Sequence, residues 1–256
     1  IAGSSIPNNP DYFPTLVLDV TPDNGTMSIT EGEAYTLSTI GSFDRDGDDF
    51  GIDFRLPGGT LTASSGPSAG GTREYTFPES GEYVATVNIF VLDGLIAGSR
   101  DRRVPLRVLN AAPEVTINSD SVAEGQVFVL PFSVTDRGIE DRQTVVVNWG
   151  DGSPTDLSQL GPGGGSGSFS HVYADNGEYT VEVCATDDDG ARTCETAIAS
   201  VANVAPSIES INQIQTVQRN ASSGDLEASI QFRVEFSDPG VADTYEVELV
   251  WSDGQS

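Results

Sequence analysis

The stretch that decides the fold of this 256-residue chain is Val145-Val146-Val147-Asn148-Trp149-Gly150-Asp151-Gly152. Trp149 ends an apolar run, and the Gly-Asp-Gly that follows it turns the chain at once. Further along, Tyr179, Val181 and Val183 recur at a spacing of two, which places them on one face of a strand. The Asp-Asp-Gly at 188–190 then favours a hairpin turn. The segment therefore predicts short β-strands joined by tight turns.

Four motifs in this segment resemble the polycystic kidney disease (PKD) domain, in the order and at the spacings of that family. They are Trp149-Gly150-Asp151-Gly152, His171 with Tyr173, Gly177-Glu178-Tyr179, and Asp188-Asp189-Gly190. The resemblance implies an all-β chain built of immunoglobulin-like sandwiches, a kind of domain common in extracellular proteins. It also implies that Trp149, Tyr173 and Tyr179 lie in the core. An exposed ring that stacks on a sugar is the alternative role for the tryptophan.

Internal repetition predicts tandem copies, arranged as beads on a string. Gly81-Glu82-Tyr83 precedes Gly177-Glu178-Tyr179 by 96 residues, so residues 14–110 form a first copy after a leader or linker at 1–13. This copy is divergent, because Arg55-Leu56-Pro57-Gly58-Gly59 stands where Gly-Asp-Gly is expected. The joint Asn110-Ala111-Ala112-Pro113 recurs 93 residues later as Asn203-Val204-Ala205-Pro206, which gives a second copy at 111–204.

Residues 205–256 repeat only the front half of the second copy. Trp251-Ser252-Asp253-Gly254 follows Trp149-Gly150-Asp151-Gly152 by 102 residues, so we expect Trp251 to be a core residue as well. Such a half has no facing sheet and leaves strand edges unpaired. We therefore expect that the native polypeptide continues beyond Ser256, or that another chain packs against this half in trans. We favour the first because long tandem arrays are usual for such domains.

The chain is strongly acidic, with 39 Asp and Glu against 12 basic residues and a formal charge of −27. Such a field repels nucleic acid and anionic membranes and attracts cations. An acidic surface tuned to salty surroundings is the less specific explanation. No apolar run is long enough to predict a membrane span in this segment. We therefore expect protein partners, either neighbouring copies or further domains of the same polypeptide, with a surface polysaccharide as a second class.

Cys184 and Cys194 stand five residues on either side of Asp189. A hairpin there places them opposite each other, which predicts a cross-strand disulfide and an oxidising compartment. Two free thiols in facing strands are the alternative. The Gly-rich run at 161–167 lacks the Lys-Ser/Thr of a phosphate-binding loop, so we expect a flexible loop there.

Enzyme chemistry has little support in this sequence, and we expect no catalytic residues. His171 is the only histidine. A hydrolytic triad needs a nucleophile held against that ring and a third group to orient it. Because His171 lies in a strand motif, a structural hydrogen bond to Asp151 is the preferred interpretation.

The strongest metal-site candidate is Asp44, Asp46 and Asp48, three carboxylates on alternate residues around Gly47. Oxygen ligands in this pattern suit Ca²⁺, which accepts six to eight of them. The resemblance adds weight, because some PKD-like domains bind calcium in this loop. An acidic turn that caps its own amides is the competing explanation. A weaker candidate comprises Asp136, Glu140 and Asp141, with the counterparts Asp238 and Asp243.

These observations predict a non-catalytic structural and interaction protein at the cell surface, such as a surface-layer, filament or adhesin component. The alternative is an accessory region of a large secreted hydrolase that positions or binds a polymer. A row of exposed aromatic residues on one sheet face would favour that alternative.

Overall fold

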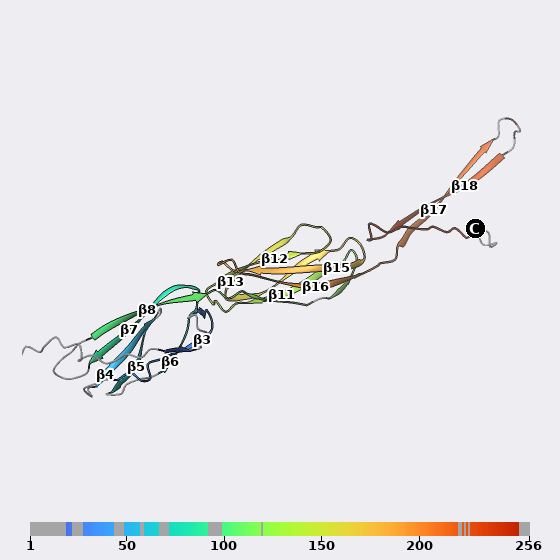
Figure 1. Cartoon of the computed structure of the whole chain (residues 1–256). Helices are drawn as coiled ribbons and strands as arrows, with labels where there is room; N and C mark the ends of the chain where they lie inside the picture. Colours follow the sequence, from blue (N-terminus) through green and yellow to red (C-terminus); the bar gives the residue numbers. More distant parts are fainter. Residues whose placement is uncertain are drawn as a thin grey trace, which may run out of the picture.

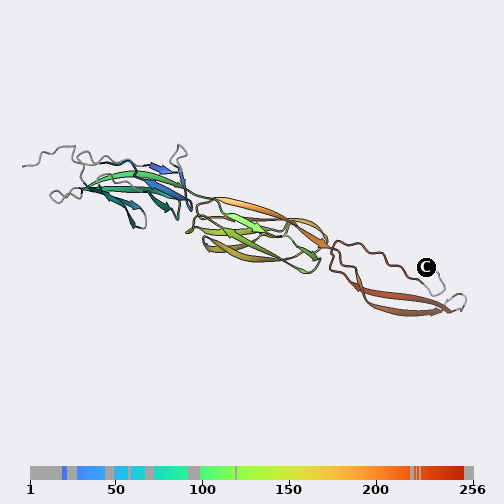
Figure 2. The same ribbon diagram turned by 90° about the horizontal axis from the view of Figure 1, so that it is seen from below.

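The computed structural model describes residues 19–21, 28–43, 49–56, 59–66, 72–91, 99–118, 120–219, 222, 224 and 226–250. The described residues form β-strands and turns and contain no helix, and hence none that could cross a membrane. Two β-sandwiches and a long hairpin follow one another along the chain, and both views show them end to end (Figures 1 and 2). The all-β, immunoglobulin-like fold predicted from the sequence is confirmed.

The first sandwich pairs a three-stranded sheet, β1-β3-β6, with a five-stranded sheet, β2-β8-β7-β4-β5. Its core holds Tyr35, Phe50, Phe54 and Phe77, each at most 2% exposed. The strands are β1 Asp19–Thr21, β2 Ser28–Thr30, β3 Ala34–Ser38, β4 Phe50–Leu56, β5 Gly59–Gly66, β6 Thr72–Thr76, β7 Gly81–Val91 and β8 Ser99–Leu109.

The second sandwich repeats this arrangement, with sheets β14-β11-β9 and β10-β16-β15-β12-β13. Along β11, buried and more exposed residues alternate, because one face of that sheet packs on the other sheet and one meets solvent. The strands are β9 Glu114–Ile117, β10 Ser121–Ala123, β11 Val127–Thr135, β12 Arg142–Asn148, β13 Asp156–Pro162, β14 Gly164–Val172, β15 Gly177–Thr186 and β16 Arg192–Ala202.

The glycine-rich run at 161–167 is not a flexible loop, so that expectation is wrong. It is a tight turn at Gly163 that joins β13 to β14, and Gly163 has φ of 73°, a value that glycine adopts without strain. A Cβ on Gly167 would lie 2.7 Å from the ring of Phe132 on β11. Glycine therefore makes room for a core aromatic ring rather than adding flexibility.

The third unit is an antiparallel hairpin of β17 Ser207–Arg219 and β18 Leu226–Ser237. Ile211 and Ile214 are about half exposed on it, at 57% and 48%. Residues 238–250 follow it without forming a strand, and Val247 there is 66% exposed. Trp251, expected in a core, lies outside the described residues.

In each sandwich, the second strand pairs in parallel with the last strand. β2 runs parallel to β8, with Ser28 opposite Arg107, and β10 runs parallel to β16, with Ser121 opposite Ser200. Directly after β2 and β10 come two glutamates, Glu31 and Glu124. The pairing thereby places each glutamate beside the end of the last strand of its sandwich, where the next unit begins.

Candidate cation sites at the domain junctions

Glu31 lies at the boundary between the first and second sandwiches. Its backbone N–H donates to the Leu109 carbonyl at 3.1 Å, and its side-chain Oε1 accepts the Ala111 N–H at 2.7 Å. The side chain is fully buried. Glu31 therefore ties the turn after β2 to the joint that leads into the second sandwich, while its second oxygen, Oε2, has no hydrogen-bond partner.

The second sandwich presents an acidic loop to this glutamate. Asp136 Oδ1 accepts the Gly138 N–H at 3.0 Å, which folds residues 136–141 into a compact turn. Asp141 is 1% exposed, and neither of its carboxylate oxygens has a hydrogen-bond partner. A carboxylate oxygen from each of Glu31, Glu79 and Asp141 lies within 4.8 Å of the other two. This triad thus combines two residues of the first sandwich with one residue of the second.

A second triad shares Asp141 and lies wholly in the second sandwich. It joins Asp136, Asp141 and Asp187, again with oxygens within 4.8 Å of one another. Asn110, in the joint, donates its amide N–H to Asp187 Oδ2 at 3.0 Å and leaves its own Oδ1 without a partner. We call these two triads together the first junction. They place five carboxylates and one free amide oxygen in a single region.

Close backbone approach shapes the first junction. A Cβ on Gly138 would lie 2.9 Å from Glu31 Cδ and closer still to Asp141 Oδ2. A Cβ on Gly32, where φ is +68°, would lie 2.5 Å from Arg137 Cβ and closer still to the Arg137 carbonyl oxygen. Glycine at these two positions lets the two sandwiches meet without a gap.

The carboxylates of the first junction repel one another. Two unit charges 4.8 Å apart at an effective dielectric constant of about 20 cost on the order of 3 kcal/mol. Burial, followed by the charges of Glu31 and Glu79, raises the pKa of Asp141 from 3.8 to about 8. Burial also raises the pKa of Glu31, against the lowering effect of its hydrogen bond from Ala111.

Basic side chains do not neutralise this cluster within the described part of the chain. Arg137 pairs with Glu33 at 2.7 Å, on the exposed rim of the junction. Ser80 donates a hydrogen bond to Asp189, which adds a further contact between the two sandwiches. The arrangement is therefore suited to a partner that is positively charged or donates hydrogen bonds. A proton held between carboxylates and a metal cation both fit that description.

The boundary between the second sandwich and the third unit repeats this geometry, and we call it the second junction. Glu124 is fully buried, its N–H donates to Ala202 at 3.0 Å, and its Oε1 accepts the Val204 N–H at 2.7 Å. Asp238 Oδ1 accepts the Gly240 N–H at 2.9 Å, as Asp136 accepts that of Gly138. Each atom named here has a counterpart at the first junction, in a residue 93 or 102 positions earlier in the chain.

The acidic cluster of the second junction consists of Glu124, Asp238 and Asp243, with oxygens within 4.8 Å of one another. Glu124 Oε2 and Asp238 Oδ2 have no hydrogen-bond partner. The Asn203 amide oxygen faces Asp243 Oδ2 and Glu124 Oε1; if the amide is turned over, its nitrogen donates to them at 3.0 and 3.1 Å. Burial, followed by the charges of Glu124 and Asp238, raises the pKa of Asp243.

The Trp149 motif forms a separate cluster in the core of the second sandwich. Trp149 is fully buried and its Nε1–H donates to Asp156 Oδ2 at 3.0 Å. The His171 ring stacks on the indole at a centroid distance of 4.7 Å, and His171 Nε2 lies 2.7 Å from Asp151 Oδ2. Tyr173 is fully buried and donates its hydroxyl to the Trp149 carbonyl at 3.1 Å. The motif residues thus bond to one another.

The geometry of Asp151 explains the Gly-Asp-Gly turn. Its carboxylate accepts the Ser153 N–H at 3.0 Å, the Ser153 hydroxyl at 2.6 Å and the contact with His171. Burial acts to raise the pKa of Asp151, but these hydrogen bonds together outweigh it and lower the pKa. The residues that give the sequence its most recognisable motif therefore hold a turn against a core aromatic ring.

Residues 110–203 match the family model of the PKD domain. This segment is similar to a PKD domain, and we call it the PKD domain. Its motifs, Trp149-Gly150-Asp151-Gly152 and His171 with Tyr173, are the ones described above. The match spans the second sandwich and begins at Asn110, in the joint between the two sandwiches.

Solved structures with a similar fold come from several sources. The PKD domain of an M14-like peptidase from a Thermoplasmatales archaeon is 26% identical, with a TM-score of 0.31 over 36% of this chain and 98% of its own. The titin domains Z1Z2, solved in complex with telethonin, are 18% identical, with a TM-score of 0.38 over 74% and 96%. Sidekick-1 immunoglobulin domains 1–5 are 15% identical, with a TM-score of 0.34 over 86% and 45%. No protein of curated function matches the sequence.

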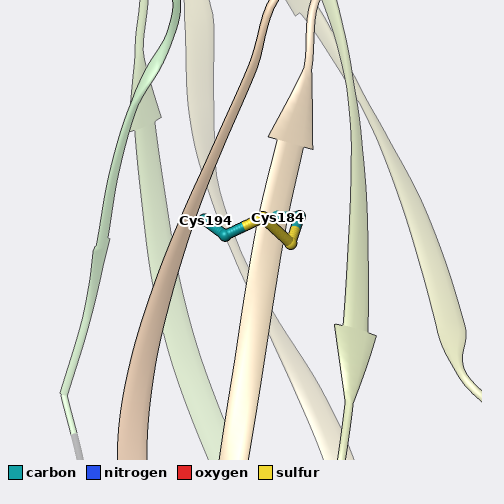
Figure 3. The surroundings of a disulfide bond; sticks show 2 residues. All are labelled: Cys184 and Cys194. Atoms are coloured by element: carbon teal, nitrogen blue, oxygen red, sulfur yellow. A yellow bond between two sulfur atoms is a disulfide. The ribbon is translucent and has the colours of Figure 1, made fainter.

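The PKD domain carries the predicted disulfide. Cys184 on β15 and Cys194 on β16 lie directly opposite each other and are bonded, as Figure 3 shows. Their Cα atoms are 4.0 Å apart, somewhat closer than the expected range of about 4.4–6.8 Å. The bond crosses two neighbouring strands of one sheet rather than linking the two sheets.

The acidic residues predicted from the sequence form one half of each junction but not the other. Asp136, Asp141, Asp238 and Asp243 were the weaker metal candidate, and all four lie in the junction clusters. Glu140, predicted with them, is exposed on the same loop. The stronger candidate, Asp44, Asp46 and Asp48, lies outside the described residues.

The missed residues include Glu79 and Asp187 and, at corresponding positions of the two junctions, Glu31 and Glu124. Glu31 and Glu124 each precede a glycine, in Thr30-Glu31-Gly32 and Ala123-Glu124-Gly125, and the two motifs are 93 residues apart. The joint at Asn110 recurs at this same offset, so the repeat itself was the available signal.

Proposed function

We propose that this chain is a non-catalytic structural segment of an extracellular protein, in which tandem PKD-like sandwiches act as a spacer and a platform for protein contacts. The observation that carries the proposal is the repeated junction. The Glu–backbone bond, the acidic turn and the close glycine contact occur at both boundaries with nearly the same distances. Repeated joints hold successive units in one defined orientation, as a spacer requires.

The surface of the PKD domain favours a spacer over a polymer-binding module. Between residues 110 and 203, the aromatic rings of the described residues are buried or partly buried. A sugar-binding face needs exposed rings on which the sugar can stack. The accessory region of a secreted hydrolase and binding of a surface polysaccharide are therefore the weaker alternatives.

The disulfide and the bonding of His171 also support the proposal. A bonded cysteine pair suits an oxidising, extracellular compartment. His171 stacks on Trp149 and contacts Asp151, which supports a structural role for the ring. Neighbouring copies of the chain or further domains of the same polypeptide are the expected partners.

The test is the location and accessibility of the PKD domain in its native setting. Antibodies raised against residues 110–203 should label intact, unpermeabilised cells of the source organism, and external protease should remove the label. Labelling that requires permeabilised cells would refute the extracellular assignment. In parallel, the purified chain should not bind isolated cell-surface polysaccharide in pull-down assays, and saturable binding would favour the accessory-module alternative.

A further inference from the structure

We propose that a calcium ion binds at each of the two junctions, held by a buried glutamate of one unit and an aspartate of the next. Glu31 and Asp141 supply these two ligands at the first junction, and Glu124 and Asp243 supply them at the second. Glu79 or Asp238 completes the respective triad. Neither unit carries the full site alone, so the ion links the units. The inference deepens the proposed spacer function and rests on it only for its biological meaning.

The unsatisfied atoms at the junctions point to a cation. Buried side-chain atoms without a hydrogen-bond partner number eight among the described residues. Six of these belong to residues of the junction clusters or to Asn110 beside them, and a seventh belongs to Gln143, whose amide donates to Asp136. All seven are oxygen atoms: Glu31 Oε2, Asn110 Oδ1, Asp141 Oδ1 and Oδ2, Gln143 Oε1, Glu124 Oε2 and Asp238 Oδ2. Buried acceptors are normally paired, so a set without donors indicates an electropositive ligand.

Burial distinguishes these clusters from ordinary acidic surface. Glu31 and Glu124 are fully buried, and Asp141 is 1% exposed. Each glutamate uses its Oε1 to hold the joint and leaves its Oε2 without a hydrogen-bond partner, and one carboxylate oxygen of each lies within 4.8 Å of an aspartate oxygen. Ionised carboxylates are rarely buried without a partner, because desolvation is costly unless a counter-charge is present.

The two junctions provide independent occurrences of the same arrangement. Glu31 and Glu124 are 93 residues apart, whereas Asp141 and Asp243 are 102 residues apart. Different neighbours surround them, with Ala111 in one joint and Val204 in the other. That both pairs converge argues for a common ligand rather than a chance meeting of acidic side chains.

Calcium fits the ligand set better than magnesium does. The ligands available are carboxylate and amide oxygens from flexible side chains, and Ca²⁺ accepts six to eight oxygens in variable geometry. Mg²⁺ requires near-octahedral geometry and keeps several waters. At the first junction, Asp141 belongs to both triads, so it can also bridge to a second ion held by Asp136 and Asp187.

The test is calorimetric titration of the full 256-residue chain with CaCl₂ after removal of metal by a chelator. The variants are Glu31→Gln and Asp141→Asn for the first junction and Glu124→Gln for the second. Glutamine keeps the oxygen that accepts the backbone N–H and removes the charge. Glu195→Gln, at an exposed position within β16 opposite Val183, is the matched control that removes one carboxylate outside both junction clusters. Circular dichroism checks that each variant is folded, and Asp141→Asn tests the first junction if Glu31→Gln does not fold.

Wild type and control should bind Ca²⁺ with a dissociation constant of about 10⁻⁴–10⁻³ M or tighter, as extracellular calcium sites do. Each junction variant should lose a binding event or bind at least about tenfold more weakly. Asp44, Asp46 and Asp48 could bind an ion of their own, so the difference between variants, not the total stoichiometry, is the criterion. In small-angle scattering, Ca²⁺ should narrow the distribution of interdomain distances in wild type but not in a Glu31→Gln/Glu124→Gln double variant.

Three results would overturn the proposal. One is the absence of binding heat and of thermal stabilisation at about 10 mM CaCl₂, ten times the weaker end of that range. Another is unchanged Ca²⁺ binding in all junction variants. The third is equal affinity for MgCl₂, which would contradict the choice of calcium. Any of these three results would overturn calcium binding at the junctions but not the extracellular spacer function, because surface labelling tests that function separately.

Discussion

Gly32→Ala tests whether the first and second sandwiches are held together by direct backbone contact. Gly32 has φ of +68° and its added Cβ would lie 2.5 Å from Arg137 Cβ. Carbon atoms in contact normally lie about 3.5–4.0 Å apart, so the two sandwiches must separate by about 1 Å at this point. An L-residue in this conformation also carries a strain of about 1–2 kcal/mol, whatever its surroundings.

The expected outcome depends on two free energies: the cost of the steric overlap and the stabilisation from the contacts between the two sandwiches. Those contacts include the exposed Arg137–Glu33 pair, worth about 0.2–1 kcal/mol, and the Asn110–Asp187 hydrogen bond, worth about 0.5–1.5 kcal/mol. Overpacking costs about 1–3 kcal/mol. The free-energy cost of the overlap is similar to the free energy that these contacts contribute. The substitution should therefore separate the two sandwiches rather than unfold either one.

Gly152→Ala is the matched control. Gly152 has φ of +82°, and no atom lies within 4 Å of an added Cβ, so this variant carries the strain without the overlap. Both variants should lose about 1–2 kcal/mol of stability in denaturant unfolding. Only Gly32→Ala should broaden the interdomain distances in small-angle scattering. Identical scattering from the two variants would show that the close contact at Gly32 does not hold the two sandwiches together.

Three further predictions concern the PKD domain and its junction. Removing the disulfide with Cys184→Ala/Cys194→Ala should cost about 2.5–3 kcal/mol in urea unfolding, the entropy of closing a loop of about ten residues; an unchanged midpoint would show that the bond constrains nothing. Trp149→Ala should cost about 3–5 kcal/mol, because it empties the centre of the core and removes the indole N–H that Asp156 accepts; a loss below about 1 kcal/mol would contradict the packing. In chelator, stability should fall as pH rises from about 4 to about 8, because the raised pKa of Asp141 makes the folded state hold a proton that the unfolded chain releases near 3.8. Asp141→Asn should flatten that pH profile in calorimetric melts, and a slope that stays the same would exclude Asp141 as its source.

Sequence patterns predicted the sandwich because its determinants are local. Tyr179 and Val181 recur with the period of a strand, and Trp149 precedes a turn that only small and acidic residues form readily. The run at 161–167 misled because glycine has two uses that composition does not separate. It permits unusual backbone angles, and it also leaves space for a neighbouring ring, which here belongs to Phe132, about 35 residues earlier in the chain.

The junction sites were only half predictable for a different reason. Asp136 and Asp141 lie on one loop, so their spacing alone suggested a shared ligand. Glu31 is more than 100 residues away from Asp141, and a glutamate before a turn glycine is an ordinary surface feature. Only the parallel pairing of β2 with β8 brings that glutamate to the end of the first sandwich.

The parallel pairing of the second strand with the last strand also determines how each sandwich would respond to a pulling force. The chain enters the PKD domain at Glu114 and leaves it at Ala202, and β10 and β16 lie side by side, pointing the same way. Tension applied through the joints reaches β16 directly and β10 by way of β9, and it pulls β10 and β16 past each other along their length. Their hydrogen bonds are then loaded together in shear instead of opening one after another. We expect each sandwich to resist extension more strongly than a hairpin such as β17–β18, whose two strands can be peeled apart from one end.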